Sequence, residues 1–529
     1  MENLILNENP SKNYKIGLNR EMEAVISAHF MHSINQDINL SLYDFEEFSS
    51  KVFYISSKSI AVHLIPILLE SSNNFIKERV IAAKIRAREN FRSYGLDSPN
   101  CVRVEHFISE VMFDRQFLKG SKSNFSKLKL CETITTLIHQ ELPIAMVIPA
   151  LPYKSSSPIK TRGVLPDLAE VNFLLSLYEI IKTIDTLYRE YKPINYIGSI
   201  FKVICDGSRF NKFLNEPDEI IHLYQKKIYF WIDKLGLSDF IQLADYQEVI
   251  SNYLPKNMQD DKIRIRNTVR ELYKEIMLPL LNPNDMAYTL KQAIALDPDP
   301  EKSNTDARFV PLFKSLVYIV RYKLLLQYAN LHDQNYTSLY KNLTQNIFTA
   351  YAELTESDFD SIHEFIINPS TINPPAKEKV IEYLRHSMIR EAWMAAIEYL
   401  AEIRSDRDLS LEPISTCLPN HVRWTIHAKP GQLAILTTTA SGDPVQPWHG
   451  VAVFKLSKSN KIKLYTLPIL ALEGNGAIPV VEIKESLEDS DYFVTPYQPL
   501  FYVDRRISFK NEEDLFAIIK NDLTRKRKF

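Results

Sequence analysis

The hydrophobic pattern of residues 144–211 is the clearest structural signal in the chain. Two apolar runs, at 144–151 (IAMVIPAL) and 199–205 (SIFKVIC), have the length and composition of buried strands. Asp167 followed by Glu170 resembles a capping box and predicts that a helix starts at Asp167. Strand, helix and strand predict a βαβ unit, closed by a short Asp-Gly turn. The apolar residues of this helix recur on one face: Leu168, Val171, Leu174, Leu175, Tyr178 and Ile181.

Helical periodicity dominates two other parts of the chain. Residues 1–120 carry apolar residues at helical spacing and are predicted to be mostly helical. A further helix is predicted at 216–236, with Pro217 near its first turn. Residues 237–430 contain no glycine, which favours helices over turns. Within them, the periodic segments predicted to be helices are 264–281, 309–331 and 338–354.

The period changes after about Pro419. Segments 421–428, 432–439, 449–457 and 461–470 alternate or run apolar over strand-like lengths, and turn residues separate them. This pattern predicts antiparallel hairpins.

Together, these patterns predict an α/β protein. It has a Rossmann-like βαβ core with a large helical insert, a helical N-terminal extension and a C-terminal β-rich part. The predicted divisions are a helical extension at 1–120, a substrate-binding α/β core at 121–235, a helical subdomain at 236–400 and a β-rich part at 401–529 that completes the active site.

Composition narrows the function classes. The 529 residues carry a formal net charge of -2 and a pI near 6.7, so nothing in the overall charge attracts nucleic acid or an anionic membrane. No apolar run approaches the roughly 20 residues needed to span a bilayer, and no signal peptide is apparent. The four cysteines show no metal-binding or disulfide spacing. We therefore expect a cytoplasmic protein that binds neither nucleic acid nor membranes.

Polar residues follow both strands of the βαβ unit. A right-handed crossover places the loops after its two strands at the same edge of a parallel sheet. Cations, hydroxyls and a carboxylate would then converge, as suits a substrate with phosphate at one end and a basic or polar group at the other. The alternative is a solvated loop with ordinary surface charges. The converging residues are Lys154, Ser155, Arg162, Asp206 and Arg209.

A second polar group lies in the C-terminal strands. Arg423 and His427 share one face of a predicted strand, and His449 follows Trp448 at the entry to another. Two histidines and an arginine would supply acid/base groups and a phosphate anchor. The alternative is that both histidines are half-buried and bonded to backbone carbonyls.

Three blocks of sequence resemble a known family. They are LPYKSSSPIKTRGVLPDLAE at 151–170, VICDGSRFN at 203–211, and PNHVRWTIHAKPGQLAIL at 419–436 followed by QPWHGVAVF at 446–454. In this order they resemble the signature blocks of the isocyanide (isonitrile) synthase family, the PvcA-type pyoverdine/dityrosine biosynthesis proteins. The resemblance covers roughly residues 144–505. The PWHGVAV segment is its most specific part.

The resemblance implies an enzyme of secondary metabolism without a metal or redox cofactor. Such enzymes condense the α-amine of an aromatic amino acid, tyrosine or tryptophan, with the ketone of ribulose 5-phosphate as co-substrate. Loss of phosphate and carbon–carbon cleavage leave an isonitrile. A separate iron/2-oxoglutarate oxygenase often acts beside them. The implied catalytic residues are Asp206, His427 and His449, and the implied substrate-binding residues are Lys154, Ser155, Arg162, Arg209, Arg423 and Trp448.

The sequence also departs from the family pattern. Ser208 stands where the family has a basic residue, and the arginine has moved one place to Arg209. In the first block, Lys160 is a substitute cation for one that the family carries earlier. Asp167 and Glu170 match the family's P-D-x-x-E pattern, but their position at a helix start equally predicts capping.

Two other functions stay open at this point. One is a catalytically altered relative that binds a metabolite or a protein, which the Ser208 departure motivates. The other is a phosphate-ligand aldolase that uses Lys154 as a Schiff base.

Overall fold

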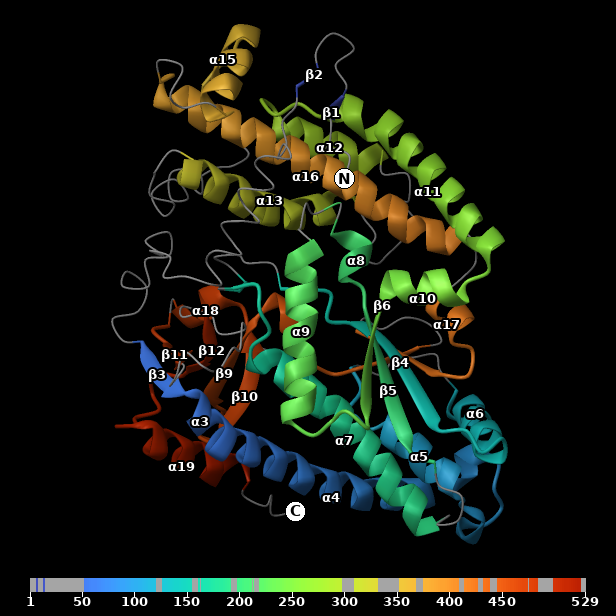
Figure 1. Cartoon of the computed structure of the whole chain (residues 1–529). Helices are drawn as coiled ribbons and strands as arrows, with labels where there is room; N and C mark the ends of the chain where they lie inside the picture. The colour runs from blue at the N-terminus through green and yellow to red at the C-terminus, as the bar shows by residue number, and fades with distance from the viewer. Residues whose placement is uncertain are drawn as a thin grey trace. The chain divides into compact units, whose positions relative to one another are not determined.

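The chain forms two compact units, shown in the computed structural model of Figure 1. The sheet unit comprises Phe48–Arg209, Ile220–Tyr253 and Ile414–Phe529, and the helical unit comprises Met1–Glu47, Phe210–Glu219 and Leu254–Pro413. All structural statements below concern the residues that the structure describes. These are 6–7, 13–14, 52–119, 126–154, 160–161, 163–191, 197–211, 213, 218–296, 309–331, 352–367, 374–408, 413–426, 432–437, 445–473, 475–483 and 498–524.

A parallel sheet forms the centre of the sheet unit. Among the described residues it has five strands in the order β6-β5-β4-β7-β8, and every neighbouring pair is parallel. Helix α7 (Leu168–Tyr191) connects β4 to β5, and α9 (Asp218–Lys234) connects β5 to β6. The strands are β4 (Ile144–Ala150), β5 (Ser199–Cys205), β6 (Ile241–Asp245), β7 (Val422–Thr425) and β8 (Leu433–Ala434).

The predicted βαβ unit is confirmed closely. Strand β4 ends one residue before the predicted run does, β5 has the predicted bounds, and the two are parallel with Ile144 opposite Ser199. The first helical residue of α7 is Leu168, and Asp167 caps it by accepting a hydrogen bond from the Ala169 N–H at 2.7 Å. The Asp-Gly turn leads into the short helix α8 (Gly207–Phe210). The α/β class predicted from the sequence is therefore correct.

A second sheet contains strands from both the N-terminal and the C-terminal part of the sheet unit. Within the described ranges its order is β10-β9-β12-β11-β3. Strand β3 (Phe53–Ser56), from the N-terminal region, pairs in parallel with β11, as Figure 1 shows where blue meets red. The other strands are β9 (Val451–Leu456), β10 (Ile462–Leu467), β11 (Ile478–Ile483) and β12 (Pro499–Val503).

The predicted hairpins are right for one pair of strands and wrong for another. Strands β9 and β10 are antiparallel, with Val451 opposite Leu467. Strands β7 and β8, however, are parallel and extend the central sheet. Every residue of β7 is buried, as in the interior of a parallel sheet covered on both faces. The apolar pattern of so short a strand does not determine the direction of its partner.

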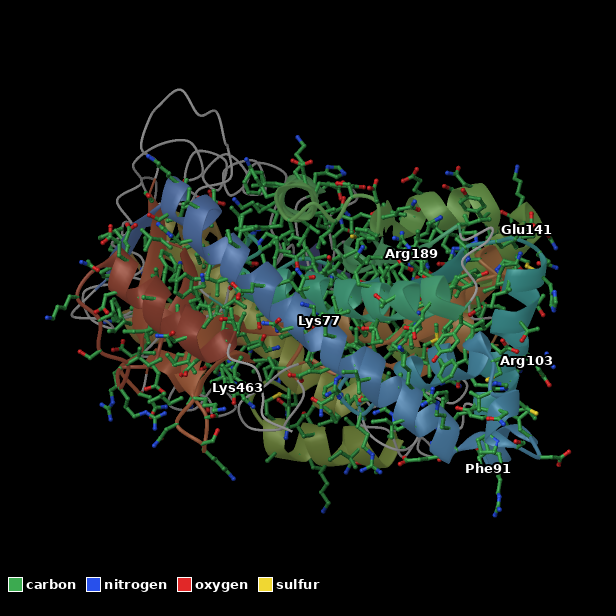
Figure 2. All side chains as sticks on the ribbon, turned by 90° about the horizontal axis from the view of Figure 1, so that it is seen from below. Lys77, Phe91, Arg103, Glu141, Arg189 and Lys463 are labelled. Carbon is green, nitrogen blue, oxygen red and sulfur yellow. The ribbon has the colours of Figure 1, made fainter. Side chains whose placement is uncertain are left out.

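Helices from the N-terminal region cover the core helix of the sheet unit. Helix α4 (Ile65–Glu89) lies across α7, as Figure 2 shows with Lys77 on α4 and Arg189 in the last turn of α7. Helix α5 (Val104–Met112) also contacts α7, and its residues are buried. The remaining helices of the unit are α3 (Ser57–Ser59), α6 (Lys127–His139), α10 (Tyr246–Tyr253), α18 (Ile469–Glu473) and α19 (Glu512–Leu523), with α17 (Pro413–Cys417) at its boundary.

The helical unit is built around one long helix. Helix α16 (Lys377–Asp408) contacts α11, α13 and α15, and its Trp393 packs edge-on against Phe309 and Phe313 at centroid distances of 4.6 and 4.9 Å. Helix α13 has the bounds predicted from its periodicity, whereas most of the helix predicted at 338–354 lies outside the described residues. The other helices are α11 (Lys256–Met277), α12 (Met286–Leu296), α13 (Phe309–Leu331) and α15 (Glu356–Ile367).

No helix in the described parts of the chain is both long enough and apolar enough to span a bilayer.

Candidate active site

The carboxyl edge of the central sheet carries the polar residues that the sequence singled out. Lys154 follows β4, Asp206 and Arg209 follow β5, and Asp245 ends β6. The loops after β4 and β5 lie against each other, because a Cβ atom added to Gly207 would come within 2.1 Å of the Pro152 carbonyl oxygen. Only glycine permits this approach. The Asp-Gly turn is thus fixed beside the loop that carries Lys154.

Lys154 is completely buried and paired with two carboxylates. Its ammonium donates to Asp167 Oδ2 at 2.7 Å and to Glu170 Oε2 at 2.9 Å, and all three side chains are at most 1% exposed. A buried charge is costly unless it is paired and hydrogen-bonded, and here both conditions are met.

The two carboxylates also cap helix α7. Glu170 accepts a hydrogen bond from the Asp167 N–H at 2.9 Å, and Asp167 accepts one from the Ala169 N–H. The predicted capping role is therefore confirmed. Helix N-termini commonly bind phosphate in α/β proteins. At α7 that position is filled by the chain's own carboxylates, with Lys154 as their counterion.

Burial and charge act in opposite directions on the pKa values of this group. Burial raises the pKa of Asp167 and raises that of Glu170 to about 7, although the Lys154 ammonium opposes both shifts. Burial alone would lower the pKa of Lys154, but the two carboxylates raise it above the usual value. Tyr224 of α9 donates to Glu170 Oε1 at 3.1 Å, and burial raises the pKa of its hydroxyl well above normal. Lys154 is accordingly held as a cation.

Contacts from the second sheet hold the same loop. The backbone N–H of Ala452 in β9 donates to the Asp167 carboxylate. Gln498 accepts from the Leu165 N–H at 3.1 Å and donates to the Leu165 carbonyl at 2.6 Å. The segment that precedes α7 is thus fixed by residues more than 280 positions away in the sequence.

Lys160 of the same loop has a different environment. Its side chain is half-buried, and in the described part of the chain its ammonium has no carboxylate partner. Burial disfavours the charged form of this amine and so lowers the pKa of Lys160. Its backbone is held in place, because the Lys160 carbonyl accepts a hydrogen bond from the Ile469 N–H at 3.1 Å.

The loop after β5 is half-buried and polar. The Ser208 hydroxyl donates to Asp245 Oδ1 at 2.9 Å, and the Arg209 guanidinium lies over the ring of Tyr246 at 4.8 Å from its centroid. Asp206 is also half-buried. Ser208, which differs from the basic residue expected at this position, therefore has a hydrogen-bond partner in Asp245.

Arg423 lies within the sheet. It is opposite Val147 in β4, which is opposite Lys202 in β5, so Arg423 and Lys202 point to the same face. Ser199, three residues before Lys202, points to the other face, where it lies close to Asp185 of α7. The Arg423 side chain thus lies on the face opposite α7.

The Pro-Trp-His segment is a short turn before β9. Trp448 is buried and packs edge-on against Phe173 of α7, with ring centroids 6.1 Å apart. His449 is exposed. The two residues therefore differ in access to solvent although they are adjacent in the sequence.

The structure brings some predicted site residues together and leaves others outside its description. Lys154, Asp206 and Arg209 follow neighbouring parallel strands, as predicted. Ser155, Arg162 and His427 lie outside the described residues. Sequence reasoning did not single out Asp245, although an aspartate that follows an apolar run was a usable signal. No sequence signal pointed to Tyr224, which reaches Glu170 only through folding.

Comparison with known proteins shows a partial similarity to one family. The sequence model of the family described as pyoverdine/dityrosine biosynthesis protein matches residues 134–361. The chain is therefore similar to this family over less than half of its length. The matched region contains the first two of the three sequence blocks, and with them β4, α7 and β5.

Two proteins of known identity are similar to the chain. L-tyrosine isonitrile synthase from Xenorhabdus nematophila is 26% identical over 156 residues, which are 27% of this chain and 44% of that protein. The match therefore spans less than half of the relative's length. The crystal structure of the PvcA protein from Pseudomonas aeruginosa has 16% sequence identity and a TM-score of 0.42, over 76% of this chain and 99% of that one.

Proposed function

We propose that the chain is an isonitrile synthase of secondary metabolism. It condenses the α-amine of an aromatic amino acid, tyrosine or tryptophan, with the ketone of ribulose 5-phosphate. The similarity of residues 134–361 to the pyoverdine/dityrosine biosynthesis family and the activity named for the Xenorhabdus relative support the reaction class. The observation that carries the proposal is that the first two family blocks meet at one edge of a parallel sheet, where Gly207 packs against Pro152.

The reaction requires three things of the site. It must hold a phosphate dianion, orient an amino acid through its charged groups, and move protons at carbons next to an imine. Asp206 receives the substrate ammonium or acts as a base, and His427 and His449 transfer protons. The phosphate and carboxylate groups are bound by a set of polar and cationic residues, Ser155, Lys160, Arg162, Arg209 and Arg423, and Trp448 shapes the amino-acid pocket.

Lys154 does not enter this proposal as a phosphate ligand. Two carboxylates already contact its ammonium, and a phosphate brought to the same place would be repelled by both. The raised pKa of Lys154 also disfavours the aldolase alternative, because a Schiff base requires a neutral amine.

The reaction is tested by incubating the purified full-length protein with ribulose 5-phosphate and tyrosine or tryptophan labelled with ¹⁵N at the α-amine. We expect an isonitrile that retains the ¹⁵N label, detected by mass spectrometry, and none when the phosphosugar is omitted. Activity that persists after dialysis against EDTA would agree with a reaction that needs no metal ion. Adding borohydride distinguishes the aldolase alternative, since only that route traps substrate on the protein.

The binding-module alternative predicts a different result. The Ser208–Asp245 hydrogen bond in the position of a basic residue favours this alternative. If ribulose 5-phosphate binds but no amino acid is consumed, the chain is a relative that binds the metabolite without converting it.

A further inference from the structure

Lys154 joins segments that are far apart in the sequence. Its two carboxylate partners cap α7, Tyr224 of α9 donates to Glu170, and Ala452 of β9 donates to Asp167. The loop after β4, two helices and the second sheet therefore meet at one buried ammonium. These contacts enclose the ammonium completely, because the Lys154 side chain is 0% exposed.

The charge balance argues against substrate binding at Lys154. One cation faces two carboxylates, so the group as a whole has no positive charge left to attract an anion. A phosphate could reach the Lys154 ammonium only by displacing a carboxylate that also caps α7. Lys160, in contrast, lies in the same loop, is half-buried and has no carboxylate partner among the described residues. An incoming anion would give Lys160 a counterion, which no described residue supplies.

We propose that the two lysines of this loop have separate roles. Lys154, together with Asp167, Glu170 and Tyr224, is a positioning residue that fixes the loop beside the Asp-Gly turn, and Lys160 binds the phosphate of the substrate. The role of Lys160 rests on the proposed function, whereas the role of Lys154 does not.

The first experiment measures stability and needs no substrate. Urea unfolding is compared for the wild type, Lys154→Met, the triple variant Lys154→Met/Asp167→Asn/Glu170→Gln, and Lys160→Met as the matched control. Lys154→Met leaves two buried carboxylates without a counterion and should raise the unfolding equilibrium constant by on the order of 100-fold to 1,000-fold. The triple variant keeps the capping hydrogen bonds without the charges and should recover most of this loss. Lys160→Met should stay within about fivefold of the wild type, because it breaks no ion pair.

The second experiment measures binding and turnover with ribulose 5-phosphate. Lys160→Met should weaken phosphosugar binding about tenfold or more and raise its KM. The triple variant, if Lys154 only positions the loop, should keep the affinity within about threefold and lose activity in kcat.

Each part of the proposal has an outcome that overturns it. A Lys154→Met protein as stable as the wild type, or a triple variant no more stable than Lys154→Met, would refute the positioning role. A folded triple variant that no longer binds the phosphosugar would show that Lys154 contacts the phosphate. Unchanged binding in Lys160→Met would refute the role of Lys160. If the wild type does not bind ribulose 5-phosphate at all, the proposed function fails, and the stability series still decides the role of Lys154.

Discussion

Two loops at the same edge of one sheet use their charges in opposite ways. After β4, Lys154 is fully buried and its charge is matched by Asp167 and Glu170. After β5, Ser208 and Arg209 are half-buried, and their partners Asp245 and Tyr246 come from the end of β6 and the start of α10.

This difference shows that position at a sheet edge does not by itself define a binding residue. Both loops follow parallel strands and both carry a cation, so topology alone treats them alike. Burial and pairing separate them, because a cation already held by two carboxylates gains little from a third anion, whereas a half-buried one can still exchange water for a ligand.

The largest expected effect comes from separating the two loops. Gly207→Ala would place a Cβ atom 2.1 Å from the Pro152 carbonyl oxygen, and a backbone atom cannot move away cheaply. We expect a loss of about 3 kcal/mol of unfolding free energy, measured by urea denaturation, together with loss of turnover.

Gly163→Ala is the matched control for this substitution. There the added Cβ atom would overlap the side chain of Gln498, which can rotate away by giving up its two hydrogen bonds to Leu165 without any backbone shift, so the loss should be smaller. If Gly207→Ala and Gly163→Ala lose the same unfolding free energy, the close approach of the two loops is not the reason that Gly207 is needed.

The next effect concerns the buried charges after β4. The pKa of Glu170 is raised from 4.5 to about 7 by burial, so between these values the folded protein binds a proton that the unfolded chain has released. The stability contribution of Glu170 is therefore complete below about pH 4.5 and is lost as the pH rises towards about 7. In Glu170→Gln this decline should be shallower, by at most about 1.4 kcal/mol per pH unit.

The measurement is the free energy of unfolding at several pH values between about 4.5 and 7.5, for the wild type and Glu170→Gln. The raised pKa of Asp167 leaves part of the decline in the variant. Two parallel curves would contradict the assignment of the titration to Glu170.

The smallest effect is expected after β5. Ser208→Ala removes the hydrogen bond to Asp245 in a half-buried place, so the loss in unfolding free energy should be about 1 kcal/mol or less. Thermal unfolding measures it. If Ser208→Ala loses as much unfolding free energy as Lys154→Met, the two loops do not differ in how tightly their polar groups are buried and paired.

The sequence predicted the local elements around the site better than their connections. Apolar runs located β4 and β5, and the Asp167–Glu170 spacing located the start of α7, because these signals depend on neighbouring residues. The direction of β7 was mispredicted as antiparallel, because strand pairing depends on residues some 270 positions away.

The candidate site was likewise predicted only where local sequence signals sufficed. Residue types and strand order placed Lys154, Asp206 and Arg209 at one sheet edge, and the sequence blocks indicated the similarity to the family. The pairing of Lys154 with Asp167 and Glu170 was not predicted, since the same capping pattern also fits a solvated helix end.

By itself, the sequence determined the βαβ core, the capped start of α7 and the similarity to the family, because spacing over a few residues carries that information. Only the tertiary structure decided which of the two lysines in the loop is neutralised. Burial and the distance to a counterion set that property, and both depend on how α9, β9 and the loop before α7 pack together.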